Sequence, residues 1–384
     1  MSGNRPVPLR LSGSAYDRGR AHGEALRRPI AEVVSRWIAE LETYYAIPAR
    51  EIIARFFERT DFLPAIECWT PHLLDEVRGI ADGCGVDFET MLAFQCVDEI
   101  WANGDRIAGE HCSTFGFRGD AGRPAILAQT IDVESFRDGA QALLLIEEEC
   151  LGGTCLVATC AGVLGFNGLN RRGLGVCCNA ELQLRHRQTG LPVAFVLRGV
   201  LEQKSVDAAA AFLREIPHAT GQHYLLADPT QMRSLECSAG AVAEWAPDDG
   251  KAIWHTNHPL ASDDLHAWYR AMLEAGESYP FLANSRVRLA TLERKLRTAG
   301  AACRPEQLRR ILASADDPRH PICSCGDEGE FYAEMGLFTF GATLMVLSDP
   351  PELHATLGPP RQTAWQVVGF DGESTSLGDA DLRS

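Results

Sequence analysis

One cysteine lies where two different halves of this sequence meet, at the start of the run His111-Cys112-Ser113-Thr114-Phe115-Gly116-Phe117. Apolar residues follow helical spacing before this point, and runs typical of strands begin after it. A cysteine at the head of a strand can attack the carbonyl of its own preceding residue, which frees its α-amine. The ordinary pKa of that amine is near 8, so it can accept the thiol proton without a histidine partner. The competing interpretation is a core cysteine at the start of a buried strand.

Composition limits the classes of partner and compartment. The chain has 384 residues, of which 46% are hydrophobic, enough for one large domain or two ordinary ones. A formal charge of −16, with no basic run, argues against nucleic acid and against anionic membrane surfaces. No apolar run resembles a secretory signal or a membrane span, so we expect a cytoplasmic protein. The odd count of 13 cysteines predicts free thiols in a reducing compartment.

No cofactor or metal is predicted. Cys323 and Cys325 lie close to His320, but no second cysteine pair follows at the spacing that zinc fingers use. A local loop is therefore the favoured interpretation of this segment.

The order of elements predicts the fold class. Residues 1–111 are predicted to be mostly helical, with helices near 30–45, 70–83 and 87–100. Further helices are expected near 193–202, 206–214, 285–296 and 305–313, and strands near 113–117, 125–131, 142–147, 155–159, 173–178, 224–227, 234–237, 252–255, 338–347 and 352–356. Strands and helices alternate in blocks, which indicates antiparallel sheets inside and helices outside, not a doubly wound parallel sheet.

Several short motifs, in their order, resemble the penicillin acyltransferase family of N-terminal-nucleophile hydrolases. The resemblance covers nearly the whole chain. The segments that carry it are Tyr16-Asp17-Arg18-Gly19 to His22-Gly23, Glu76 to Gly83, Cys112-Ser113-Thr114, Gln129-Thr130-Ile131-Asp132, Gly165 to Gly173 with Asn179, Thr256-Asn257-His258, Ser285-Arg286 and Gly358-Pro359-Pro360.

The resemblance implies an α+β fold, a four-layer αββα sandwich of two antiparallel sheets between helical layers. It also implies an inactive precursor, or zymogen, that cuts itself between His111 and Cys112. Residues 1–111 would form a helical α segment and residues 112–384 a β segment, both staying associated in one catalytic domain. His111 departs from the small residue, commonly glycine, that precedes the nucleophile in relatives, and a bulky imidazole there could slow cleavage or assist it.

Roles for single residues follow from the same resemblance. Cys112 would be the nucleophile, and Asp132, at the end of an apolar strand, would bond the α-amine or nearby hydroxyls; a turn aspartate is the alternative. The amide of Asn257 suits an oxyanion hole, and a turn before Pro259 is its alternative. Ser285 and Arg286 would form the family's Ser-Arg pair that anchors the aspartate. Arg288 is set aside because a helix places it about 200° from Arg286.

Three further residues are predicted to bind the oxyanion or the substrate. Asn179 would complete the oxyanion hole through its backbone N–H, and Gln129 and Thr130 precede Asp132 on the same strand. His255, His258 and His22 are expected to be structural, because an α-amine base needs no histidine.

These residues predict an autocatalytically activated amidohydrolase or N-acyltransferase that works through an acyl-cysteine. The substrate would be a small-molecule amide or amino-acid conjugate, and the acceptor water, an amine or the thiol of CoA, with acyl-CoA a candidate co-substrate. A homo-oligomer is compatible with the sequence. Two alternatives differ in class. An uncut, non-catalytic binding module would keep the same fold, whereas a papain-like protease is disfavoured because no glycine-rich segment surrounds Cys112.

Overall fold

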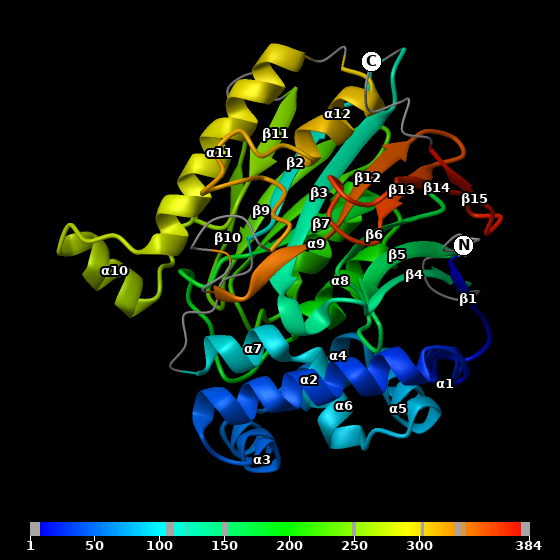
Figure 1. The fold of residues 1–384 in the computed structure, drawn as a ribbon, viewed down its shortest axis with the longest axis vertical. Helices are drawn as coiled ribbons and strands as arrows, with labels where there is room; N and C mark the ends of the chain where they lie inside the picture. The colour runs from blue at the N-terminus through cyan, green and yellow to red at the C-terminus, as the bar shows by residue number, and fades with distance from the viewer. Residues whose placement is uncertain are drawn as a thin grey trace.

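Two β-sheets form the centre of the molecule (Figure 1). The computed structural model describes residues 8–104, 111–120, 122–147, 153–247, 251–300, 303–326, 332 and 335–377. The first sheet has eight strands in the order β1-β4-β5-β6-β7-β8-β9-β10, and the second has seven in the order β11-β2-β3-β12-β13-β14-β15. Every pairing is antiparallel except that of β1 with β4.

The strands of the eight-stranded sheet are β1 (Leu9–Leu11), β4 (Gln141–Ile146), β5 (Cys155–Cys160), β6 (Asn167–Asn170), β7 (Gly175–Ala180), β8 (Gln222–Ala227), β9 (Met232–Cys237) and β10 (Val242–Trp245). Those of the seven-stranded sheet are β2 (Ser113–Phe117), β3 (Ala125–Glu134), β11 (Ala252–His255), β12 (Leu337–Leu347), β13 (Glu352–Thr356), β14 (Gln366–Val368) and β15 (Ser374–Ser376).

Helices cover the outer face of each sheet. On the eight-stranded sheet, α8 (Val193–Leu201) packs on β6 and β7, and α9 (Val206–Glu215) packs on β8 and β9. On the seven-stranded sheet, α11 (Pro280–Ala299) packs on β11 and β2, and α12 (Pro305–Leu312) packs on β12 and β3. The inner faces meet where β2 and β3 contact β7 and β8. The predicted αββα order of layers is therefore present.

The N-terminal helices gather at one end of this sandwich (Figure 1). They are α1 (Ala15–Ala25), α2 (Arg27–Tyr45), α3 (Ala49–Arg59), α4 (Leu63–Trp69), α5 (Pro71–Cys84), α6 (Phe88–Gln95) and α7 (Val97–Ala102). Their buried residues share a hydrophobic core with strands of both sheets. A short helix, α10 (Ala267–Glu274), and a 3₁₀ turn, η1 (Ser135–Arg137), complete the described elements.

The motifs Tyr16 to Gly23 and Glu76 to Gly83 form a close helix crossing between α1 and α5. A Cβ atom added at Gly19 would lie 1.9 Å from the carbonyl oxygen of Glu76, and one at Gly79 would lie 2.2 Å from that of Tyr16. No side chain fits at those distances, so glycine is required on both helices. The carboxylate of Glu76 is fully buried there between Arg18 and Arg198, the latter at 2.7 Å.

Most predicted elements are present, and the differences have local causes. Asp87 and Ser205 are residue types that favour helix N-caps, and the side chain of each accepts a backbone N–H in the first turn of its helix. An Asn-Gly pair such as Asn167-Gly168 is typical of a turn, but here it lies in β6, which is buried throughout. A Cβ at Gly168 would come within 2.3 Å of the carbonyl oxygen of Leu156, so this glycine allows a close strand approach instead of a turn.

Candidate active site

Cys112 lies directly before β2 and is almost completely buried. Its neighbours on β2 pair with β3, with Ser113 opposite Thr130 and Thr114 opposite Gln129. The backbone N–H of Ser113 also donates to the hydroxyl of Thr130 at 3.2 Å. On the other side, β11 pairs with β2, so that His255 lies opposite Thr114. The head of β2 is thus held between two strands, which fixes the backbone on either side of the thiol.

Arg288 on α11 is the residue that ties this backbone to the rest of the site. Its guanidinium has no exposed surface and donates to the carbonyl oxygen of Cys112 at 2.8 Å and to the hydroxyl of Ser113 at 2.9 Å. It also donates to the side-chain oxygens of Asn257 at 2.9 Å and Asn284 at 2.7 Å. One planar fork therefore sets the relative positions of the cysteine and the Asn257 amide.

The sequence prediction chose Arg286, and the geometry corrects that choice. Arg286 is exposed to solvent, whereas Arg288 contacts Cys112. Helix α11 begins at Pro280, not at Ser285, and its buried positions include Ser285, Arg288, Leu292 and Leu296. Arg288 falls one and two turns before the buried leucines, so the 3.6-residue period of the helix was the signal that identified it.

Ser285 connects α11 to the loop that carries Asn257. Its hydroxyl accepts the backbone N–H of Asn257 at 2.8 Å, donates to the hydroxyl of Thr256 at 2.9 Å and lies 2.7 Å from Nδ1 of His258. Burial lowers the pKa of His258 to about 3, so this imidazole is neutral near pH 7. The loop is thus fixed by neutral hydrogen bonds from one helix.

The side chain of Asn257 keeps a donor for chemistry. Its oxygen accepts from Arg288, which orients the amide, and its nitrogen donates to the carbonyl oxygen of Ala180 at 3.0 Å. An amide nitrogen carries two N–H groups, so one remains after that bond. Asn179, by contrast, uses its side-chain nitrogen for the hydroxyl of Thr114 at 3.2 Å and the carbonyl oxygen of Thr256 at 2.8 Å. Its side chain therefore braces β2 against the Asn257 loop.

Asp132, near the end of β3, is a fully buried carboxyl. Neither of its oxygens has a hydrogen-bond partner of good geometry in the described part of the chain. Burial raises the pKa of Asp132 to about 7, and the Thr339 hydroxyl and the charge of Arg288 act in the opposite direction. The predicted direct bond from an arginine to this aspartate is not among the contacts of Arg288. Asp132 can therefore change protonation near neutral pH.

His111 is accommodated in a fitted site. Its imidazole stacks on Phe281, with 4.9 Å between ring centroids, and Nδ1 lies 3.1 Å from the side-chain oxygen of Asn284. Its backbone N–H donates to the carbonyl oxygen of Asp132 at 3.3 Å. Burial, followed by the nearby charge of Arg288, lowers the pKa of His111 well below its ordinary value, so the ring is neutral. The bulk of the imidazole is thus compatible with the buried His111–Cys112 peptide.

A mostly apolar cavity opens beside Cys112. Cys112 itself is part of the cavity lining. Apolar side chains form most of its wall, among them Phe94, Val97, Ile131, Phe166 and Leu197. A few polar groups interrupt this wall, namely Gln95, Asp98, Gln129, Arg137 and Gln222. Such a lining suits an apolar group that enters with one polar end.

Comparison with known proteins adds the family. A sequence profile for the family described as acyl-coenzyme A:6-aminopenicillanic acid acyl-transferase matches residues 118–333, more than half of the chain. The chain belongs to this family. The matched segment begins shortly after Cys112, so the family assignment does not depend on that residue. It confirms the resemblance drawn from the sequence, and because the family is that of an acyltransferase, it supports an amidohydrolase or acyltransferase enzyme.

Two individual proteins are also similar. Protein dcd1B of Dictyostelium discoideum is 25% identical over 223 residues, which are 52% of this chain and 43% of that protein. This chain therefore matches less than half of the length of that relative. The solved structure of penicillin V acylase from Agrobacterium tumefaciens aligns with a TM-score of 0.38 at 14% identity, covering 67% of this chain and 83% of the acylase.

The remaining predicted residues have defined places in this member of the acyl-transferase family. Gln129 lines the cavity. Its side-chain oxygen accepts a hydrogen bond from the side-chain N–H of Asn167 at 2.8 Å, which fixes the orientation of the Gln129 amide. Thr130 bonds the backbone of Ser113 and braces β2. Asn284, which sequence reasoning missed, lies four residues before Arg288 on the same helical face, and that spacing was its signal.

The described helices do not include one long and apolar enough to cross a bilayer.

Proposed function

We propose that this chain is a cysteine enzyme that cuts itself before Cys112 and then cleaves or transfers the N-acyl group of a small amide. The observation that carries the proposal is the position of Cys112. It lies beside an apolar cavity, on backbone held by an arginine that also orients the Asn257 amide. Nucleophile, oxyanion donor and acyl pocket are thereby available within one site.

Self-cleavage would begin with the thiol of Cys112. Its sulfur attacks the carbonyl carbon of His111, the peptide C–N bond breaks, and the nitrogen of Cys112 takes a proton to become a free amine. Water then hydrolyses the resulting thioester and releases the carboxylate of His111. Asp132 is the candidate base for the attack, because its pKa of about 7 allows it to accept a proton at neutral pH. Residues 111 and 112 are almost fully buried, so an external protease could not reach this bond without unfolding the site.

Turnover would then use the amine that cleavage releases. The amine accepts the thiol proton while sulfur attacks the substrate amide carbonyl, and Asn257 donates its remaining N–H to the oxygen that gains charge. The amine of the substrate leaves with the transferred proton, which gives an acyl-Cys112 thioester. Attack by water gives hydrolysis, whereas attack by an amine or a CoA thiol gives acyl transfer. The two fragments would stay associated, because the N-terminal helices share a core with both sheets.

The cavity favours an apolar acyl group. Its walls are mainly apolar, and the few polar side chains among them can orient the polar end of a ligand. A small-molecule amide or an amino-acid conjugate fits this description. No cofactor is needed for any step, since the residues of the chain supply nucleophile, base and oxyanion donor.

Intact mass and N-terminal sequencing of the purified protein test self-cleavage. We expect two fragments separated before Cys112, where an uncut chain would have a mass of 42.0 kDa. Cys112→Ala should stay at full length and be inactive against a panel of N-acyl amines offered with and without amine or CoA acceptors. Cys178→Ala is the matched control, because Cys178 lines the same cavity. An active wild-type protein that stays at full length, or an active Cys112→Ala variant, would refute the proposal, and an inactive full-length protein would favour the binding module.

The oxyanion role has its own test. Asn257→Ala should lower kcat by about 10²-fold or more with a smaller change in KM, because the donor acts mainly in the transition state. Asn103→Ala, on an amide that caps α7 away from Cys112, should leave turnover unchanged. An unchanged kcat in Asn257→Ala would return that residue to a turn-forming role.

A further inference from the structure

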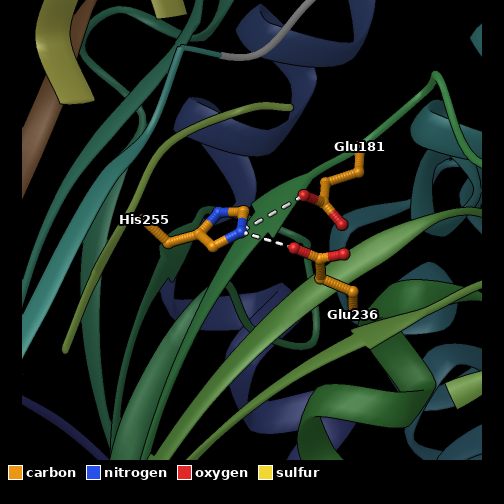
Figure 2. A group of neighbouring side chains, drawn as sticks. All are labelled: Glu181, Glu236 and His255. Carbon is orange, nitrogen blue, oxygen red and sulfur yellow. Dashed lines mark hydrogen bonds and ion pairs between the residues drawn. The ribbon is translucent and has the colours of Figure 1, made fainter. Parts of the chain in front are cut away.

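Three ionisable side chains with no exposed surface, Glu181, Glu236 and His255, point toward one another (Figure 2). Glu181 follows β7, Glu236 lies in β9, and His255 ends β11. Nε2 of His255 lies 3.0 Å from a carboxylate oxygen of Glu236 and 3.5 Å from one of Glu181. The first two residues belong to one sheet and the third to the other. Two carboxylates without access to water are costly unless a positive charge lies between them.

The hydrogen bonds of His255 determine which ring nitrogen carries the proton and which one faces the carboxylates with a lone pair. Nδ1 lies 2.8 Å from the carbonyl oxygen of Thr256, and a carbonyl only accepts, so Nδ1 carries a proton and donates it. The lone pair of Nε2 in the neutral ring then points at two carboxylate oxygens. That arrangement is repulsive unless a proton or a cation lies between them.

A proton on Nε2 resolves only part of the problem. It would pair His255 with Glu236, the nearer carboxylate. Glu181 would remain with both oxygens buried and without a hydrogen-bond partner in the described residues. Glu236, in contrast, is well satisfied, because its two oxygens also accept the backbone N–H groups of Leu260, Ala261 and Ser262. Glu181 therefore needs either a proton of its own or an additional cation, and the test below separates the two.

We propose that Glu181, Glu236 and His255 bind a divalent transition-metal ion, for which zinc is the best match. Neighbouring ligand atoms of a tetrahedral zinc ion with bonds of about 2.1 Å are about 3.4 Å apart, close to the 3.0 and 3.5 Å seen here. A divalent ion also neutralises both carboxylates. The second oxygen of Glu181, Oε2, has no hydrogen-bond partner and is available to complete the coordination.

The surroundings match those of metal ligands. A ligating histidine donates its other ring N–H to a carbonyl or carboxylate, as His255 does to Thr256. Ligating carboxylates are usually hydrogen-bonded in turn, as Glu236 is to three backbone N–H groups. His223 stacks on His255 with 3.8 Å between ring centroids and fixes the plane of the imidazole. The three ligands come from distant parts of the chain, which is why no motif spacing predicted this site.

The ion would act as a structural link between the two sheets beside Asn257. Ala180, whose carbonyl oxygen accepts from Asn257, directly precedes Glu181, and His255 is two residues before Asn257. Binding would therefore hold the Asn257 loop from the side opposite to Ser285 and Arg288. The site does not depend on the proposed acyl chemistry, because its ligands do not line the cavity beside Cys112.

The test measures metal content and thermal stability of the full chain, purified without chelator or metal-affinity tag. We expect about one equivalent of zinc or another first-row divalent metal by elemental analysis. Removing it with a chelator should lower Tm by about 5 °C, and added ZnCl₂ should restore it. Glu181→Gln should lose the metal and no longer respond to ZnCl₂. The matched control is Glu202→Gln, which alters a carboxylate 2.6 Å from a different histidine, His72, and should keep both properties.

Three results would overturn the assignment. The first is a wild-type protein that contains no metal and whose Tm does not respond to ZnCl₂. The second is zinc bound equally by the wild type and by Glu181→Gln, which would assign the ion to thiols elsewhere. A Glu181→Gln variant as stable as the metal-loaded wild type would likewise favour a protonated Glu181 over a ligand, because an amide replaces a neutral carboxylic acid at little cost. None of these readouts requires enzymatic activity.

Discussion

Replacing Arg288 with alanine removes a side chain that joins the Cys112 backbone to the Asn257 amide. Four acceptors would lose the arginine donor, namely the carbonyl oxygen of Cys112, the hydroxyl of Ser113 and the side-chain oxygens of Asn257 and Asn284, and of these the Asn284 oxygen keeps Nδ1 of His111 at 3.1 Å. A buried acceptor left without a donor costs about 1–3 kcal/mol, but relaxation and entering water recover part of the sum. We therefore expect the free energy of unfolding to fall by about 4 kcal/mol, as for other buried charged networks that lose one member.

Arg288→Lys separates the charge from the shape of the side chain. Lysine keeps the positive charge but cannot present the planar fork that reaches four acceptors at once. We expect a loss of about 2 kcal/mol in stability, together with at least a 10²-fold loss in kcat because the Asn257 amide is no longer aimed. If only the positive charge of Arg288 mattered, Arg288→Lys would keep the wild-type kcat. The lysine variant therefore tests whether orientation of the Asn257 amide is required.

The assays are urea unfolding, intact mass and turnover, with Arg286→Ala as the matched control. Arg286 is exposed on the same helix, and its loss should change stability by no more than about 0.5 kcal/mol and leave turnover unchanged. The reasoning fails if Arg288→Ala is as stable and active as the wild type. It fails equally if Arg286→Ala is the more damaging substitution, since that result would restore the assignment made from the sequence.

Three further substitutions test the ionisation, the cavity and the helix crossing. Because burial raises the pKa of Asp132 to about 7, its folded form binds a proton more tightly than the unfolded chain does, and the wild type should lose up to about 4 kcal/mol of stability between pH 4 and 8. Unfolding curves of Asp132→Asn across that range should show no such loss of stability. If the free energy of unfolding of the variant fell with pH as much as that of the wild type, the burial argument would be wrong. Ala194→Phe, in the cavity wall, should shift kcat/KM towards shorter acyl groups, whereas the exposed Ala211→Phe should not. Gly79→Ala should lower unfolding stability by at least about 3 kcal/mol because backbone meets the new Cβ, and Gly122→Ala, with open space around it, by less than 1 kcal/mol.

The sequence was sufficient for elements whose pattern is local. The long strands β3 and β12 are rich in apolar residues and buried throughout, and the helix caps at Asp87 and Ser205 follow from residue type and spacing. Short elements lacked such a pattern. Strand β15 is Ser-Thr-Ser, so it carries no apolar alternation and is defined only by its pairing with β14. A strand of this kind depends on its partner, which single-sequence reasoning does not contain.

Residue type also misled where a polar side chain bonds across the fold. Asn167 suggested a turn, but its amide donates to partners far away in sequence, the side-chain oxygens of Gln129 and Thr343. These long-range bonds satisfy the amide nitrogen inside a buried strand, which removes the usual reason for asparagine to favour a turn. Asn170, at the end of the same strand, does form a turn, because its side-chain oxygen accepts the backbone N–H groups of Arg172 and Leu174.

The candidate site shows the same division between local and distant information. Cys112, Asp132, Asn257 and Ser285 could be named from their neighbours in sequence. The choice between Arg286 and Arg288 needed the phase of α11, which depends on where the helix begins and which leucines it buries. The triad of Glu181, Glu236 and His255 needed the pairing of strands from both sheets and had no local signal.

The Asn257 loop is held from two independent directions, and this bears on how the site can fail. Ser285 and Arg288 hold it from α11, through the backbone N–H and the side-chain oxygen of Asn257. His255 holds its other flank through the buried carboxylates behind it. An oxyanion donor must stay within a few tenths of an ångström of its position, and a loop anchored on one side only would rotate about that anchor. A double variant that removes one anchor on each side should therefore lose more kcat than the product of the two single losses. Each remaining anchor limits the motion of the loop in a single variant, and neither does so in the double variant.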